Sequence, residues 1–187
     1  GARPERVGRL VNLEGFGMSA TRPEQAPGRY AKWMDEIKSF RRGELDLQTY
    51  AECSGVARRL MRTNPRLPQD KADWLAAHWA TQITRPDGTR VWAILGDASH
   101  KIVNAYLYRV DEAVECNKAI RAPVLAVEAV EGMLRTWKKR GAEDDFLARL
   151  RQVPRIELVR VEDAGHMMHH DQPEEVAALI ESFIARS

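Results

Sequence analysis

The chain has 187 residues, enough for one domain with a hydrophobic core or for a core with a helical insertion. Its 29 basic and 27 acidic residues give a formal net charge of +2, and both signs are scattered along the chain, which argues against nucleic acid or a membrane as the partner. No apolar run approaches the roughly 20 residues that cross a bilayer, and no leader sequence opens the chain, so we expect a cytoplasmic protein. Cys53 and Cys116 form no CxxC pair and are expected to be buried free thiols.

Three short apolar runs predict the core of the fold. The first, around residues 10–13, ends at a glycine, which is typical of a strand buried in a parallel sheet. Residues 122–129 form a compact run of β-branched and apolar residues, and residues 156–161 alternate apolar with charged side chains, as a strand with one exposed face does. Helices are expected over residues 109–119, after the second run, and from Pro173 onward. The apolar stripe of the last helix is expected to comprise Val176, Leu179, Ile180 and Phe183. This order predicts an α/β layer architecture.

Between the first two runs, after a loop over residues 16–28, apolar residues recur at the three- and four-residue spacing of helices with one buried side. A first helix surrounds Trp33. A second is expected to begin at Asp46 as its cap, to include Tyr50, and to end near Asn64, because prolines follow. A third starts at a proline, and its buried side is expected to comprise Trp74, Leu75, Ala76 and Trp79. A turn over 84–89 and a short extended piece over 91–94 complete this region.

The most informative stretch is Val161–Val176, which reads Val-Glu-Asp-Ala-Gly-His-Met-Met-His-His-Asp-Gln-Pro-Glu-Glu-Val. A predicted strand ends, a glycine turns the chain, His166 stands at the turn, and a Pro-Glu-Glu segment opens the last helix. This order places an imidazole at the carboxyl edge of a parallel sheet, where α/β proteins collect their reactive groups. The segment resembles the last strand, histidine loop and last helix of α/β-hydrolases, in which Ala-Gly-His leads after several residues into Pro-Glu-x-Val.

Two more segments resemble the same family, in the right order. Pro4–Val7, leading into the first strand, is similar to the approach to the family's sixth strand, and Ile120–Leu125 is similar to the approach to its seventh. The resemblance covers nearly the whole chain and implies a partial α/β-hydrolase fold: a mainly parallel sheet remnant with a helical lid insertion. It implies three regions: a first core strand and loop over 1–28, the lid over 29–109, and the C-terminal core strands and helices with the histidine loop over 110–187.

By this resemblance His166 is the general base, which takes a proton from a serine and later activates water. Imidazole suits the role because its unperturbed pKa of about 6.5 lets it accept and release a proton near neutrality. The alternative is a histidine that only caps the following helix. His169 and His170 follow at three and four residues, a spacing that a metal site on a helix can use, but no carboxylate or cysteine completes a ligand set, so we expect no metal.

The orienting acid has two candidates. The family usually places it after the seventh strand, in a pattern such as Pro-Val-Leu-x-Val-x-Gly-x-x-Asp; in this chain the glycine becomes Ala129 and the aspartate position falls on Gly132. Glu131, one residue earlier, is the first candidate, since Glu replaces Asp in some triads. Glu14, at the end of the first strand, is the second, because some relatives place the acid there. The alternative for either is a solvated loop charge.

The chain has no Gly-x-Ser-x-Gly elbow, the turn at which the family's serine stands beside backbone oxyanion donors. The nearest sequence surrounds Ser19, but it follows the wrong strand and lacks the closing glycine, and Ser54 lies inside a predicted helix. The resemblance therefore implies that the N-terminal part of the fold, with the nucleophile, is absent from this chain.

Our first hypothesis is that the chain is the C-terminal portion of a serine-type α/β-hydrolase that acts on a small apolar ester or related substrate and needs no cofactor. Within the same fold, epoxide hydrolases and haloalkane dehalogenases use an aspartate nucleophile instead. The second hypothesis is a non-catalytic fragment or interaction module. In that case an exposed sheet edge pairs with a second copy or with the missing N-terminal half.

Overall fold

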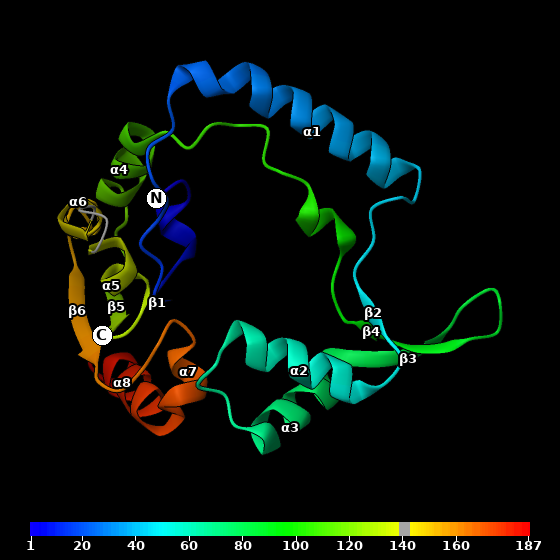
Figure 1. Ribbon diagram of the computed structural model, residues 1–187. Helices are drawn as coiled ribbons and strands as arrows, with labels where there is room; N and C mark the ends of the chain where they lie inside the picture. The colour runs from blue at the N-terminus through cyan, green and yellow to red at the C-terminus, as the bar shows by residue number, and fades with distance from the viewer. Residues whose placement is uncertain (139–142) are drawn as a thin grey trace. The chain divides into compact units, whose positions relative to one another are not determined.

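The computed structural model describes residues 1–138 and 143–187, and it divides into two compact units (Figure 1). The first unit comprises residues 1–20 and 108–187, and the second comprises residues 21–107. The expected loop over residues 16–28 contains helical structure from Pro23 onward.

The first unit is built on a parallel sheet of three strands. β1 (Leu10–Leu13) pairs with β5 (Val124–Ala129), which pairs in turn with β6 (Ile156–Val161), so the strand order is β1-β5-β6. Leu10 lies opposite Val124, and Val124 lies opposite Ile156. The structure confirms the three strands and the parallel arrangement that the apolar runs predict. Because the strands are parallel and in step, their carboxyl ends lie at one edge of the sheet.

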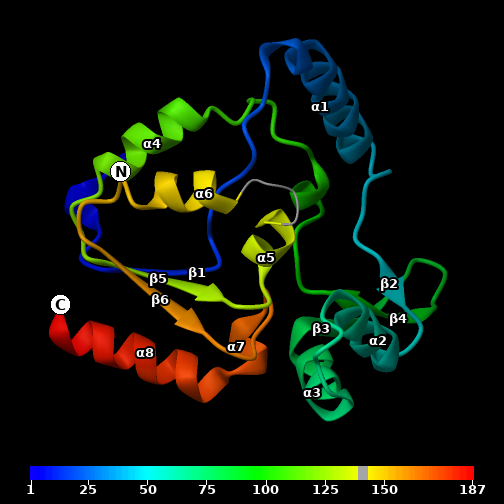
Figure 2. The ribbon, with the colours of Figure 1, turned by 60° about the vertical axis from the view of Figure 1, so that its left-hand side comes forward.

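Helices cover both faces of this sheet, as Figure 2 shows: α8 (Pro173–Arg186) lies along one face, and α4 (Val110–Lys118) and α6 (Glu143–Leu150) lie on the other. Alternate residues of β5 point to opposite faces, as in any strand. Ala126 packs in a cluster with α6 and with α5 (Met133–Lys138). The residues of β5 that pack in the cluster on the α8 side are Leu125, Val127 and Ala129.

The last helix has clear start signals in the sequence. Pro173 takes the first helical position, where its missing N–H costs nothing, and Glu174 and Glu175 in the first turn interact favourably with the helix dipole. The short helix α7 (Met168–Asp171) precedes it, and a 3-10 turn, η1 (Pro4–Arg6), precedes β1. The predicted apolar stripe of α8 is confirmed, and its members in the core are Val176, Leu179, Ile180 and Phe183.

The second unit combines helices with a small antiparallel sheet of order β2-β4-β3. Its core lies between α2 and α3, around Val56 and Ala76. The predicted turn over 84–89 is confirmed, because the Arg85 N–H donates to the Thr89 carbonyl and Gly88 takes a positive φ. In chain order the elements are η2 (Pro23–Gln25), α1 (Ala26–Arg41), β2 (Thr49–Tyr50), α2 (Cys53–Thr63), α3 (Gln69–Trp79), β3 (Ala80–Thr84), β4 (Arg90–Ile94) and η3 (Ala98–Lys101).

The structure corrects several details of this region. The second helix begins at Cys53 and not at Asp46, because Tyr50 pairs with Trp92 across β2 and β4. Trp74 and Trp79 were expected on the buried side of α3 but are 61% and 44% exposed, since Ala72, Leu75 and Ala76 fill that side. Cys116 is exposed, and Cys53 is partly buried. Among the helices of the described residues, none is both long and apolar enough to cross a membrane.

We expect the central strand to carry much of the first unit's stability. Leu125, 1% exposed in β5, packs in the cluster with α8. Leu125→Ala should lower the free energy of unfolding by about 2–5 kcal/mol, because truncation removes buried methyl groups and leaves a cavity. Leu158→Ala, at a 39% exposed site on β6, is the matched control and should cost no more than about 1 kcal/mol. Urea denaturation measures both, and equal losses would contradict the assignment.

Candidate active site

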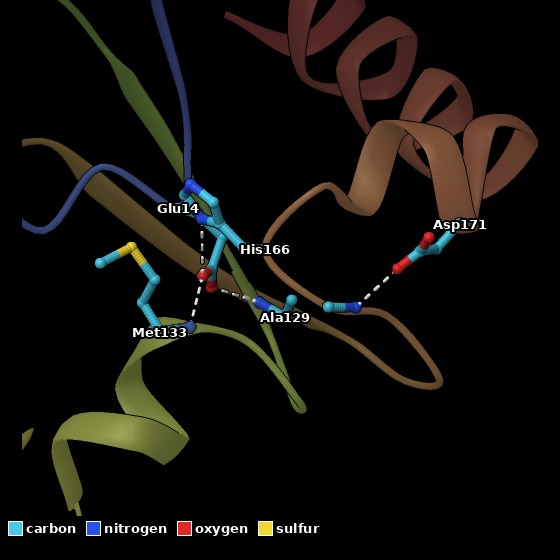
Figure 3. Close-up of polar contacts among 6 residues, drawn as sticks. Glu14, Ala129, Met133, His166 and Asp171 are labelled. Atoms are coloured by element: carbon cyan, nitrogen blue, oxygen red, sulfur yellow. Dashed lines mark hydrogen bonds and ion pairs between the residues drawn. The ribbon is translucent and has the colours of Figure 1, made fainter. Parts of the chain in front are cut away.

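The candidate site lies in the first unit, at the edge where the parallel strands end (Figure 3). Glu14 directly follows β1, Ala129 is the last residue of β5, and His166 stands five residues after β6. These residues are far apart in the sequence, and the sheet brings them together. The carboxyl ends of strands in open α/β sheets are where such proteins bind ligands.

The Glu14 carboxylate is buried and held by backbone donors. Its side chain is 1% exposed. Oε1 accepts a hydrogen bond from the Ala129 N–H at 2.8 Å, and Oε2 accepts one from the Met133 N–H at 2.8 Å. Two charge-assisted hydrogen bonds of this kind offset much of the cost of taking a carboxylate out of water. Glu14 has a φ of 58°, in the left-handed region, which is uncommon for a residue with a side chain.

His166 contacts this carboxylate. Its Nδ1 lies 3.4 Å from Glu14 Oε2, and its side chain is 54% exposed. That separation is long for a hydrogen bond, and catalytic hydrogen bonds in proteins without substrate are often long. The tautomer with the proton on Nδ1 makes this contact a hydrogen bond donated to Glu14, and it leaves the lone pair on Nε2. The imidazole ring therefore contacts a buried acid through Nδ1 and is otherwise accessible to solvent.

The loop that carries His166 is fixed by α7 and the residue after it. The Gly165 N–H donates to Asp171 Oδ2 at 2.8 Å, as Figure 3 shows. The Gln172 side-chain amide donates to the Asp163 carbonyl at 3.2 Å, and Asp163 has a φ of 45°. Met168, fully buried at the start of α7, anchors the segment in the core. The loop is thus held on both sides of the histidine.

His169 and His170 lie beside this loop, with ring centroids 4.2 Å apart. Burial lowers the pKa of His169 below its ordinary value; Asp171 opposes this effect, and the neighbouring His166 adds to it. Burial therefore favours the neutral form of the His169 ring. Among residues 1–138 and 143–187, no group of three or more His, Cys, Asp or Glu side chains is arranged to hold a metal ion.

The two acid candidates lie in different environments. Glu14 is the carboxylate that contacts His166, whereas Glu131 is exposed and forms an ion pair with Arg135, one turn further along α5, at 3.7 Å. The Glu131 backbone N–H donates to the Ala164 carbonyl at 3.0 Å, which helps to join the β5–α5 turn to the histidine loop. One sequence feature points to Glu14 as the acid: it directly follows a predicted parallel strand. The carboxyl end of that strand lies at the same edge of the sheet as the histidine loop.

Ser19 and Ser54, which the sequence argued against as nucleophiles, have neither the sequence nor the setting of an elbow. Ser19 lies in an exposed loop after β1. Ser54 is in α2 of the second unit, where its hydroxyl donates to Glu52 Oε2 at 3.0 Å. A cavity of about 130 Å³ lies between β1, α4 and α6, and residues that line it include Asn12, Phe16, Tyr108 and Leu150. Neither Glu14 nor His166 is part of its wall, so it is separate from the candidate site.

Comparison of the sequence with models of protein families and with curated proteins gave no match. Among solved structures, the chain is similar to a hypothetical protein of Pseudomonas aeruginosa PAO1, with 23% identity, a TM-score of 0.77, and coverage of 99% of this chain and 61% of that one. An M. tuberculosis esterase shares 16% identity with a TM-score of 0.62 and coverage of 98% and 56%. An α/β-hydrolase from Novosphingobium aromaticivorans DSM 12444 shares 20% identity, with a TM-score of 0.53 and coverage of 100% and 59%. The chain has a partial α/β-hydrolase fold.

The likeness to α/β-hydrolases extends over nearly all of this chain but over only part of the other proteins. The chain spans 61% of the length of the Pseudomonas structure and 59% of the Novosphingobium one. The resemblance in the three sequence segments and the observed fold agree: both indicate part of the α/β-hydrolase fold, with a parallel sheet and flanking helices. At identities of this size the likeness establishes the fold, and the function rests on the residues at the edge of the sheet.

We expect Asp171 to hold the histidine loop in place. Asp171→Ala removes the acceptor of the buried Gly165 N–H, which should lower the free energy of unfolding by about 1–3 kcal/mol and speed hydrogen exchange at that amide. Asp171→Asn keeps an oxygen acceptor and should cost roughly half as much, because only the charge is lost. Exchange measured by NMR distinguishes the two. A Gly165 amide that exchanges equally fast in all three proteins would contradict this role.

Proposed function

We propose that the chain is the C-terminal part of a serine-type α/β-hydrolase, in which His166 is the general base and Glu14 the acid that orients it. One observation carries the proposal: a carboxylate with a 1% exposed side chain lies 3.4 Å from Nδ1 of a half-exposed imidazole. Both residues stand at the carboxyl edge of a parallel sheet. A base oriented by a buried acid on one nitrogen, with the other nitrogen left for proton transfer, is the arrangement that acyl transfer requires.

The proposed proton path follows from this geometry. With its proton on Nδ1 and directed at Glu14, His166 uses Nε2 to accept the proton of a serine hydroxyl as that oxygen attacks an ester carbonyl. The imidazolium then gives the proton to the departing alcohol. In the second half of the reaction Nε2 accepts a proton from water, which attacks the acyl-enzyme, and returns it to the serine. Glu14 stays ionised throughout and stabilises the positive ring.

Glu14 is a better candidate for the acid than Glu131 on two grounds. Its carboxylate touches the histidine and is fixed by two backbone donors, so its position is set in advance of the reaction. Glu131 is 44% exposed at its side chain and pairs with Arg135, so solvent screens its charge. The fixed, buried carboxylate is the one that can hold a ring in a single tautomer.

The nucleophile in this proposal comes from polypeptide outside residues 1–187. The chain has no Gly-x-Ser-x-Gly sequence, and it spans 61% of the Pseudomonas structure. Among the strands that the structure describes, β1 pairs with β5 alone, so the other side of β1 is where an N-terminal portion of the fold would pair. The proposed substrate is a small apolar ester or a related compound, a choice supported by the likeness to an esterase. The proposed proton path uses only side chains and water and calls for no cofactor.

The open edge of β1 also favours a second candidate, an interaction module that pairs edge to edge with another copy and performs no chemistry. This candidate predicts that the purified chain self-associates reversibly. Sedimentation velocity over a range of concentrations measures this directly. A chain that stays monomeric at every concentration excludes pairing between copies.

The hydrolase proposal makes a prediction for ester hydrolysis. The chain alone should hydrolyse p-nitrophenyl butyrate no faster than buffer, whereas a polypeptide that continues upstream of Gly1 should turn it over. In that longer protein His166→Ala should lower kcat by about 10⁶-fold and Glu14→Gln by about 10⁴-fold, in line with other triads.

Glu131→Gln is the matched control, because it makes the same chemical change in a neighbouring carboxylate. We expect its kcat to stay within about twofold of the parent, since an exposed carboxylate that pairs with the exposed Arg135 contributes little. Loss of activity in Glu131→Gln with full activity in Glu14→Gln would reverse the assignment of the acid. Activity in the chain alone that survives His166→Ala would refute the proposal itself.

A further inference from the structure

Gly132 lies against the Glu14 carboxylate, in the turn that joins β5 to α5. A Cβ atom at this position would be 2.4 Å from Oε2 and 2.6 Å from both Cδ and Oε1 of Glu14. Non-bonded atoms attract one another at about 3.5–4.0 Å and repel strongly at such shorter distances. Glu14, in its present position, therefore excludes every side chain from position 132.

The backbone does not explain this glycine. The glycines with positive φ in the described residues are Gly17, Gly43 and Gly88, and Gly132 is not one of them. Its N–H donates to the Ala129 carbonyl at 2.9 Å and closes an ordinary turn, which other residues can adopt. The requirement for glycine comes from the carboxylate that fills the space beside it.

The same turn supplies the donors that hold the acid. The Ala129 and Met133 N–H groups, which bond the two carboxylate oxygens, lie on either side of Gly132 in the sequence. They belong to the backbone, so they persist whatever side chain stands at residue 14 or 132. The turn thus forms a fixed place for one carboxylate next to Nδ1 of His166.

We propose that Gly132 is a positioning residue of the site. The absence of a side chain at 132 lets the carboxylate of Glu14, directly after β1, reach the donors of the turn and Nδ1 of His166. A side chain at 132 would displace that carboxylate and leave the imidazole without its acid. The inference rests on the proposed role of Glu14 as the orienting acid.

The first test is a double-mutant cycle on the stability of the whole chain. Gly132→Ala should lower the urea midpoint in the parent protein, because the methyl group collides with the carboxylate. In the Glu14→Ala background the same change should leave the midpoint unchanged or raise it, because the space is then free and alanine restricts the unfolded chain more than glycine does. Gly8→Ala is the matched control, since a Cβ there meets no atom within 4 Å. A Gly132→Ala loss of equal size in both backgrounds overturns the inference.

The second test reads the histidine ring and needs no nucleophile. Ring ¹⁵N resonances, recorded at about pH 8, where an ordinary imidazole is neutral, report which nitrogen carries the proton. The parent should carry it mainly on Nδ1, and Glu14→Ala should shift the population toward Nε2. Gly132→Ala alone should also shift the population toward Nε2, because the methyl group displaces the carboxylate from the ring, and Gly8→Ala, the matched control, should leave it unchanged.

The outcomes separate the two proposals. If Glu14→Ala leaves the ring resonances unchanged, Glu14 does not orient His166, and both the acid assignment and the positioning role of Gly132 are wrong. If Glu14→Ala shifts the resonances but Gly132→Ala does not, the acid assignment stands and the inference about position 132 fails. Shifts in Glu14→Ala and in Gly132→Ala, with none in Gly8→Ala, support both.

Discussion

The buried carboxylate of Glu14 is the interaction on which the site depends. A charge with so little access to water is costly unless its oxygens are bonded, and here the partners come from β5, the β5–α5 turn and the histidine loop. The two donors flank one turn after β5, the imidazole follows β6, and the carboxylate follows β1, so these bonds form only when the three strands are in their native register. The fold and the site are therefore coupled through one side chain.

The parallel sheet sets the distances in this arrangement. Because β1, β5 and β6 run in the same direction and start level with one another, their carboxyl ends deliver Glu14, the donor turn and His166 to the same edge. β5 is fixed most firmly, since it lies between two strands and is covered by helices on both faces. The acid is thus bonded to the most buried strand, while the base stays accessible to solvent. This division suits a pair in which one group must be fixed and the other must exchange a proton.

Sequence patterns predicted the elements that depend on local order and missed those that depend on distant contacts. The three core strands and the stripe of α8 follow from short apolar runs and from helical spacing, and His166 follows from its Gly-His context at a strand end. The choice between Glu131 and Glu14 depends on which carboxylate reaches the ring across strands, and spacing along the chain does not contain that information. Trp74 was misplaced because helical spacing allowed either face of α3, and Ala72, Leu75 and Ala76 fill the buried one.

The close approach of Gly132 to the carboxylate also constrains how such a site can change over generations. A lineage that moves its acid from one strand to the next must alter two codons. Gaining the new side chain first crowds the old carboxylate, and losing the old carboxylate first leaves the ring without an anion. Either order passes through an impaired intermediate, so the acid's location should persist in descendants long after the surrounding surface has diverged.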